Sequence, residues 1–343
     1  MKRLLILLVF LGGIALGFLA FYIRAELAAP GPASGFVVEI PRGLGARSVV
    51  DLLAEKHVIR DRYVTLAYLL YTRSYNRLQA GEYIFERPLT IPEVVDKITK
   101  GGVYLHKFTV PEGLTVKDTA TKWEEQGFGK AEEFLLAAAG AVDLVRTVNE
   151  KAVSVEGYLF PETYSFPART TPRQAIGAMV ARFRQTVERL KQVVPASSWP
   201  RDLHDTTIVA SLVETEAAHA DERPLIASVY LNRLKRNILL QCDPTVIYAL
   251  ELANRYRGTL TLADLRFKSP YNTYVTPGLP PGPIANPGYA SLLAAVQPAT
   301  TNYLFFVRTA EGRHTFSENL SAHNRAVAAY RRSQRAVRRT PRS

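Results

Sequence analysis

The sequence predicts an α+β fold in three parts: an N-terminal transmembrane helix, a small mixed module, and a larger domain that mixes α-helices and β-strands. Three observations support this prediction. An uncharged apolar stretch opens the chain, short strand-like and helix-like patterns alternate over the next segment, and the remainder carries both kinds of pattern. With 343 residues and a 47% hydrophobic composition, the chain can bury a core in each folded part.

The opening apolar segment, residues 4–22, has about the length that crosses a bilayer as a helix. Lys2 and Arg3 precede it, so the positive-inside rule leaves the N-terminus in the cytoplasm and the rest of the chain on the far side. A cleaved signal peptide is the alternative, but bulky aromatic residues crowd the end of the segment, where cleavage needs small ones. We therefore predict an uncleaved, single-pass anchor in the cytoplasmic membrane over residues 1–24, and a linker over residues 25–35.

The next part, residues 36–102, has the pattern of a small mixed module. We predict strands and helices in the order strand 36–40, helix 48–57, helix 63–71, strand 81–85 and helix 90–100. This pattern suits a small binding module and suits a plain spacer equally well.

The cysteine content excludes two common ways of stabilising a fold. Cys242 is the only cysteine, so no intrachain disulfide can form, and no Cys/His spacing for zinc is present. We expect Cys242 to be a small packing residue and the fold to rely on its hydrophobic core.

The net charge of +12 is concentrated at the C-terminus. Residues 331–343 form a basic tail with six arginines and no acid: Arg331, Arg332, Arg335, Arg338, Arg339 and Arg342. Such a block is typical of a disordered, solvated tail, and anionic lipid or anionic polymer are its alternative partners. Nucleic acid ranks last among the alternative partners, and we expect none to bind, because no nucleic-acid-binding module precedes the tail.

A larger domain is predicted over residues 103–330, and its segment EGYLFPETYSF (156–166) is rich in aromatic residues. The segment also holds Glu156 and Glu162. It can be core packing, or it can be a wall that faces carbohydrate, since aromatic faces stack on sugar rings. The sequence leaves both interpretations open.

The helix predicted within residues 206–224 carries the candidate acid. Ile208, Leu212 and Glu216 recur at helical spacing, which puts Glu216 on the apolar stripe, while Glu214 points to roughly the opposite side. A carboxyl group in apolar surroundings loses hydration, which raises its pKa and lets it hold a proton near neutral pH. A structural ion pair is the alternative role for Glu216.

Other charged residues of this region suggest structural roles. We expect Asp221 to cap a following helix, and Glu222 to form a structural pair with Arg223 or Arg233. The two histidines His314 and His323 are too far apart to form a local metal pair, so we expect each to be a hydrogen-bonded structural residue. No metal site is predicted.

The segment SPYNTYVTPGLPPGPIANPG (269–288) has six prolines and three glycines, which excludes a regular element. Long irregular segments in compact domains are often functional loops. Its residues Tyr271, Asn272, Thr273 and Tyr274 offer amide, hydroxyl and ring groups that suit sugar hydroxyl and acetamido groups.

Taken together, these segments resemble the endolytic murein transglycosylase family, the YceG-like proteins. The resemblance is carried, in order, by EGYLFPETYSF, ASLVETEAA, ASVYLNRL, LQCDPTVIYAL, SPYNTYVTPGLPPGPIANPG and HTF. It runs from the anchor to about Tyr330. Three features depart from the family pattern: Thr215 stands where lysine is frequent, Cys242 where serine or threonine is usual, and the arginine-rich tail is additional.

The resemblance implies an anchored enzyme that cuts nascent peptidoglycan between MurNAc and GlcNAc within the strand and leaves 1,6-anhydro-MurNAc ends. It implies a LysM-like module over residues 36–102 and a catalytic domain over residues 103–330. The second acid of the E-x-E pair, Glu216, would be the general acid and base, with Glu214 as the runner-up. Substrate-binding residues would be Tyr271, Asn272, Tyr274, Glu156 and Asp243.

The same resemblance implies no cofactor and no metal. The expected partners are peptidoglycan glycan strands, the cytoplasmic membrane, and penicillin-binding proteins or other wall synthases. Two alternatives stay open at this stage. A non-catalytic scaffold could bind glycan and recruit synthases, and a small-molecule lyase of the aminodeoxychorismate type would need a lysine bound to pyridoxal phosphate, for which no lysine here has a recognisable context.

Overall fold

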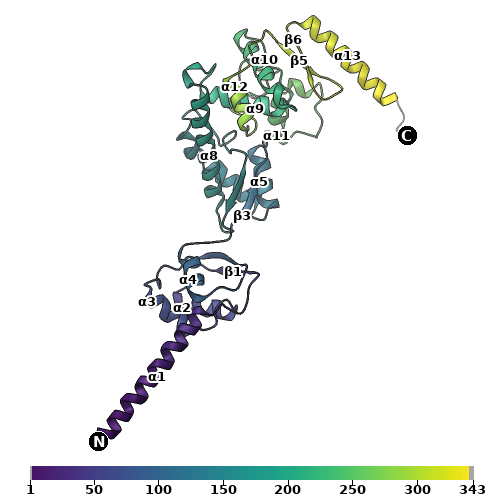
Figure 1. Cartoon of the computed structure of the whole chain (residues 1–343). Helices are drawn as coiled ribbons and strands as arrows, with labels where there is room; N and C mark the ends of the chain where they lie inside the picture. Colours follow the sequence, from purple (N-terminus) through teal and green to yellow (C-terminus); the bar gives the residue numbers. More distant parts are fainter. Residues whose placement is uncertain (1, 340–343) are drawn as a thin grey trace. The chain divides into compact units, whose positions relative to one another are not determined.

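The computed structural model describes residues 2–339, with side chains described through residue 334. The chain divides into two compact units. One comprises the residues up to 107 together with 165–170, and the other comprises 108–164 together with the residues from 171 onward. Figure 1 shows the elements of both units in chain order.

Helix α1 (Lys2–Ala28) confirms the predicted N-terminal apolar helix. Within the described residues it is the one helix long and apolar enough to cross a membrane. None of its residues is fully buried, although Ile23 and Leu27 near its end pack partly against the core of the first unit. Its length and composition fit a single membrane span, as an anchor or as a signal sequence.

The first unit contains the five elements predicted for the small module. They are β1 (Phe36–Ile40), α2 (Ala46–Glu55), α3 (Arg62–Tyr71), β2 (Gly81–Phe85) and α4 (Ile91–Thr99). Strands β1 and β2 pair antiparallel. The order and type of the elements are confirmed, and their ends agree to within two residues.

Local capping explains where two of these helices begin. The Asp61 side chain accepts hydrogen bonds from the backbone N–H groups of Tyr63 and Val64 at the start of α3. Thr90 and Glu93 form a reciprocal capping box at the start of α4. Each cap satisfies N–H donors that have no partner within the helix.

The second unit begins with small elements around a buried aromatic group. They are β3 (His106–Thr109), α5 (Val116–Glu125), α6 (Ala131–Ala139), α7 (Val142–Arg146) and β4 (Thr163–Phe166). Strands β3 and β4 pair with each other, and the chain passes between the two units within them. The rings of Phe108, Trp123 and Phe134 are fully buried and contact one another through Trp123.

Five helices build the rest of the second unit. They are α8 (Pro172–Val193), α9 (Leu203–Glu216), α10 (Arg223–Lys235), α11 (Asp243–Leu252) and α12 (Tyr289–Val296). Helix α9 contacts α10, α11 and α12 (Figure 1). All residues from Thr206 to Val213 are buried, so α9 is a central helix covered on every side rather than the one-sided helix that its periodicity predicts.

The prediction that Asp221 caps a helix is wrong. Asp221 lies in the short 3₁₀ turn η2 (Ala220–Glu222), and α10 begins directly after it with no side-chain cap. The Asp221 carboxylate instead forms an ion pair with Arg313. Two further 3₁₀ turns, η1 (Ala196–Ser198) and η3 (Asp264–Arg266), connect neighbouring helices.

The proline-rich segment 269–288 is irregular, as predicted, but its second half is not an open loop. Residues 282–288 are buried. The Ile284 N–H donates to the Ser211 hydroxyl on α9, and the Asn286 side chain accepts from the Leu159 N–H and donates to the Leu114 carbonyl. This part of the segment is therefore a packed strap that fixes the position of α9.

A β-hairpin and a long helix complete the second unit. The hairpin consists of β5 (Phe305–Arg308) and β6 (His314–Ser317), and the helix is α13 (Leu320–Arg339). The expectation of a disordered tail is wrong for its described part, because residues 331–339 continue α13. Residues 340–343 lie outside the described residues.

Candidate active site

Glu216 is the last residue of the buried central helix α9. The next residue, Ala217, has an extended backbone with φ −77° and ψ 110°, so the chain leaves the helix at this point. A residue at the end of a covered helix can reach an opening that residues in the middle of the helix cannot. Glu216 is accordingly partly exposed, whereas the residues from Thr206 to Val213 are buried.

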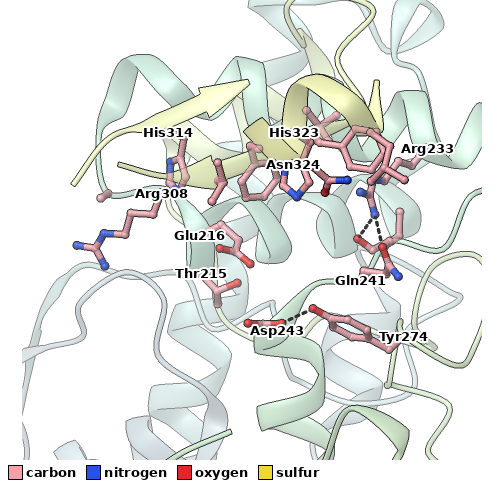
Figure 2. A pocket seen from close by; sticks show the side chains of 17 residues that line it. Thr215, Glu216, Arg233, Gln241, Asp243, Tyr274, Arg308, His314, His323 and Asn324 are labelled. Carbon is pink, nitrogen blue, oxygen red and sulfur yellow. Dashed lines mark hydrogen bonds between the residues drawn. The ribbon is translucent and has the colours of Figure 1, made fainter. Parts of the chain in front are cut away.

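The opening at this position is a pocket of about 550 Å³, a size typical of small-ligand sites. Its walls come from the end of α9, from α10 and α11, from the β5–β6 hairpin and from the start of α13. Polar and aromatic lining residues include Thr215, Glu216, Arg233, Gln241, Asp243, Tyr274, Phe305, Phe306, Arg308, His314, His323 and Asn324. Figure 2 shows Glu216 near the middle of this set.

The surroundings of Glu216 favour its protonated form. Burial raises the pKa of Glu216 to about 7, the negative charge of Asp243 adds to the rise, and a hydrogen bond from Cys242 opposes it. The Cys242 Sγ lies 3.6 Å from Glu216 Oε1. Near neutral pH a substantial fraction of this carboxyl group therefore holds a proton, as a general acid must.

Asp243, the first residue of α11, is a second carboxyl group in the same pocket. The Tyr274 hydroxyl donates a hydrogen bond of 2.5 Å to Asp243 Oδ1. The structure places Asp243 close enough for its charge to act on the pKa of Glu216.

Both carboxylate oxygens of Glu214, the runner-up acid, accept hydrogen bonds from other residues of the second unit. Its Oε1 accepts a hydrogen bond of 3.0 Å from the Arg223 guanidinium, and its Oε2 accepts one of 2.9 Å from the Gly288 N–H. Its side chain is 4% exposed and does not line the pocket that contains Glu216. The structure thus separates the two acids of the E-x-E pair into a pocket residue and an ion-paired residue.

Two of the predicted sugar-binding residues lie outside this pocket. Asn272 is fully buried, and its side chain donates to the carbonyls of Leu265 and Phe267, which stabilises the irregular segment. The Tyr271 ring packs against Tyr248 with centroids 5.0 Å apart. Of the YNTY run, only Tyr274 lines the pocket.

Glu156 also lies elsewhere in the second unit. It lines a separate pocket of about 350 Å³, whose wall is largely aliphatic and contributed by α5, α6, α7 and α11. Its oxygens accept hydrogen bonds from the Val116 N–H and the Tyr248 hydroxyl. The structure therefore does not bring Glu156 together with Glu216.

Sequence reasoning missed a buried pair at the edge of the Glu216 pocket. Glu222 Oε1 accepts a hydrogen bond from the His314 N–H, and Glu222 Oε2 lies 2.8 Å from His314 Nδ1. The expected pairing of Glu222 with Arg223 or Arg233 is wrong, since Arg223 pairs with Glu214 and Arg233 donates to backbone carbonyls, among them that of Leu304. The HTF run that begins at His314 was the only local signal for this pair.

Among residues 2–339, no three or more His, Cys, Asp and Glu side chains are grouped so that they could hold a metal ion. The chemistry of the pocket is carried instead by one carboxyl group of raised pKa, a neighbouring carboxylate, and hydroxyl, amide and imidazole groups. That donor set suits proton transfer to and from a polar organic ligand.

By its fold and its site, this chain is an α+β protein with an N-terminal apolar helix and a pocket equipped for general acid–base chemistry. Comparison with known families then identifies the family. The sequence model of the YceG-like family matches residues 38–329, so the chain belongs to the YceG-like family.

Named relatives and a solved structure agree with this membership. A Bacillus subtilis (strain 168) protein named endolytic murein transglycosylase is 32% identical over 85% of this chain and 84% of its own length. A Streptococcus pneumoniae protein of the same name is 28% identical, and the match covers 58% of that longer protein. A crystal structure of a YceG-like protein from Listeria monocytogenes, 30% identical, matches with a TM-score of 0.58 over 85% of this chain and 99% of the other.

Proposed function

We propose that this chain is an endolytic murein transglycosylase that cleaves nascent peptidoglycan between MurNAc and GlcNAc inside the strand and leaves 1,6-anhydro-MurNAc ends. Family membership and the names of the relatives support the reaction class. The observation that carries the proposal is the carboxyl group of Glu216, whose pKa is raised to about 7 by burial at the wall of a polar pocket.

The proposed reaction needs one proton donor at the scissile bond. Glu216 protonates the glycosidic oxygen as the bond to C1 of the MurNAc residue breaks. The 6-hydroxyl of the same sugar then attacks C1 and closes the anhydro ring, so no water is consumed. In the simplest scheme the ionised Glu216 takes the 6-hydroxyl proton and is ready for the next cycle.

Two neighbouring side chains have groups that can position the sugar. The Tyr274 hydroxyl and the Asp243 carboxylate are linked and line the pocket. We assign them to contacts with sugar hydroxyl and acetamido groups. Tyr271, Asn272 and Glu156 do not line this pocket, so any effect they have on the substrate at Glu216 would be indirect.

The proposal extends to the rest of the chain. Helix α1 would be an uncleaved anchor with its N-terminus in the cytoplasm and the catalytic domain on the other side of the membrane. The order β1–α2–α3–β2 supports a LysM-like module over residues 36–102, which would bind glycan, and residues 103–330 would be the catalytic domain. Wall synthases such as penicillin-binding proteins are the proposed partners, because they make the strands that this enzyme would cut.

The test is product analysis with the full-length protein in detergent micelles or nanodiscs. Uncrosslinked glycan strands are incubated with wild type and with Glu216→Gln, and the new chain ends are identified by mass spectrometry. Glu188→Gln is a matched control, because Glu188 is an exposed acid on α8 that pairs with the neighbouring Lys191 and does not line the pocket. We expect anhydro ends from wild type and Glu188→Gln and almost none from Glu216→Gln.

Other outcomes have clear meanings. Strand binding without new ends would favour the glycan-binding scaffold. New reducing ends in place of anhydro ends would mean a hydrolase that uses Glu216 and Asp243 as a carboxylate pair. Either result would overturn the proposed reaction.

A further inference from the structure

The β5–β6 hairpin brings an imidazole into the pocket that contains Glu216. His314 is the first residue of β6 and pairs with Arg308 on β5. Both residues line the pocket, and in the view of Figure 2 Glu216 lies between His314 on the hairpin side and Asp243 on the α11 side. The scheme above gives both proton transfers to Glu216 and leaves His314 without a role.

The orientation of the His314 ring is fixed by Glu222. The Glu222 side chain is 3% exposed, and its two oxygens face two nitrogens of one residue, the backbone N and Nδ1 of His314. Burial alone would raise the pKa of Glu222, but hydrogen bonds from His314 and the charge of Arg313 hold it below its usual range. Glu222 is therefore a carboxylate, which can only accept, so Nδ1 carries the proton in this contact.

This assignment leaves Nε2 as the ring nitrogen that Glu222 does not contact. The His314 side chain is 6% exposed, and the Phe306 and Phe316 rings pack against it at centroid distances of 5.3 and 6.3 Å. Among the described residues, Nε2 has no hydrogen-bond partner. The Nε2 atom itself is not buried. When the ring is neutral, the lone pair of Nε2 can accept a proton from a ligand in the pocket.

We propose that His314 is a second catalytic residue: its Nε2 takes the proton of the muramic acid 6-hydroxyl while Glu216 protonates the departing glycosidic oxygen. The C1–O4 bond breaks and the C1–O6 bond forms. One proton moves from Glu216 to O4 and one from O6 to Nε2, and exchange with solvent then returns both groups to their starting states. Glu222 is the positioning residue, since its carboxylate stabilises the imidazolium that forms. This inference rests on the proposed function.

The charges around the ring are consistent with this role. The charged groups around it are Glu222 from η2, Arg313 from the turn of the hairpin beside Glu222, Arg308 from β5, and Glu216 from the end of α9. The carboxylates stabilise an imidazolium as it forms, and the arginines oppose it. The same geometry, a carboxylate on one imidazole nitrogen and the reacting group on the other, is how serine hydrolases orient their base.

The first experiment compares the full-length His314→Gln protein with wild type on glycan strands. We expect the rate to fall by about 10²-fold, the usual scale for losing one acid–base group. We also expect the ratio of reducing to anhydro ends to rise, because slower capture by the 6-hydroxyl gives water time to react at C1. A purely structural role for His314 would lower the rate without changing this ratio.

His106→Gln is the matched control. It removes another contact between a histidine and a glutamate, the 2.5 Å pair of His106 with Glu82, outside the pocket. We expect it to keep the wild-type product ratio. A His314→Gln protein that melts like wild type and gives wild-type rates and ratios would overturn the inference, and the proposed function would survive as long as wild type makes anhydro ends.

The second experiment needs no variant that could fail to fold. If two groups share the proton transfers, the wild-type rate of anhydro-end formation has a bell-shaped pH profile, with an acidic limb from the base and an alkaline limb from Glu216. A single acid gives the alkaline limb alone. A wild-type profile without an acidic limb, measured where thermal melting shows the protein folded, would therefore overturn the role of His314.

A third experiment assigns the acidic limb to this residue. His314→Ala supplied with free imidazole should regain activity if the limb belongs to His314.

Discussion

The second unit contains two glutamates whose pKa is raised by loss of hydration at the carboxyl group, and only one of them lies in a pocket suited to catalysis. Burial raises the pKa of Glu216 to about 7 and that of Glu156 to about 8. Glu156 accepts hydrogen bonds from Val116 and Tyr248 beside a largely aliphatic pocket. Among the described residues, Glu216 receives one weak hydrogen bond, from the Cys242 thiol, and it faces a polar pocket. A raised pKa alone therefore does not define an active site, because the proton also has to be within reach of a substrate.

The largest expected effect comes from replacing each acid by glutamine. Glu216→Gln keeps the size of the side chain but removes the transferable proton, so anhydro-end formation should fall by about 10²–10⁴-fold. Glu156→Gln keeps a carbonyl oxygen for the Val116 N–H and should cost far less activity. Initial rates on glycan strands, corrected for the folded fraction from thermal melting, provide the measurement. Equal losses of activity in the two variants would contradict the conclusion that Glu216, and not Glu156, lies within reach of the substrate.

The pH dependence of the rate sharpens the assignment of Glu216. The acid must be protonated to act, and its pKa is raised to about 7. The rate should therefore fall on the alkaline side of pH 7, by about tenfold per pH unit once the group is ionised. A fall that begins near pH ~4.3, where exposed glutamates ionise, would mean that the surroundings of Glu216 do not hold its proton.

The protonation of Glu156 should affect the free energy of unfolding rather than the reaction rate. Its pKa is raised to about 8 in the folded protein, whereas an unfolded chain ionises a glutamate near ~4.3. Between these values only the folded state holds the proton. The contribution of Glu156 to the free energy of unfolding is thus present at low pH and declines by up to about 1.4 kcal/mol per unit as pH rises through this window.

Glu156→Gln isolates this contribution, because glutamine has no proton to lose. Melting of wild type and variant is compared at several pH values from about 5 to 8. Wild type should be favoured most at the acidic end, and its advantage should shrink as pH rises. A difference in melting temperature that does not change with pH would show that Glu156 is not protonated in the fold.

Much of the fold could be predicted from local patterns. Helices α2, α3 and α4 follow from apolar periodicity together with capping side chains such as Asp61 and the Thr90–Glu93 box, all encoded within a few residues. Glu216 was selected for a similar reason, its helical spacing from Leu212 and Ile208, but α9 is covered on every side, so this spacing alone does not distinguish Glu216 from its neighbours.

The contacts that complete the site could not be predicted in this way. Glu222 and His314 are 92 positions apart, and Asp243 acts on Glu216 only because α11 packs against α9. No period in the sequence encodes such pairs, which depend on how distant elements pack. The same limit explains why Glu156 and Asn272, plausible sugar ligands by residue type, are placed elsewhere by the fold.

The smallest expected effect concerns the thiol beside Glu216, the proposed catalytic acid. Cys242 is buried, and its hydrogen bond to Glu216 lowers the pKa of that carboxyl against the larger effect of burial. Cys242→Ala removes the donor, so the pKa of Glu216 should rise and the alkaline limb of the rate should move to higher pH by a fraction of a unit. Cys242→Ser is the matched control, because a hydroxyl is a stronger donor and should move the limb the opposite way. If the alkaline limbs of both variants shift in the same direction, packing around Glu216, rather than the hydrogen bond from Cys242, sets the pKa of Glu216. The difference between Glu216 and the hydrogen-bonded Glu156 would then rest on burial alone.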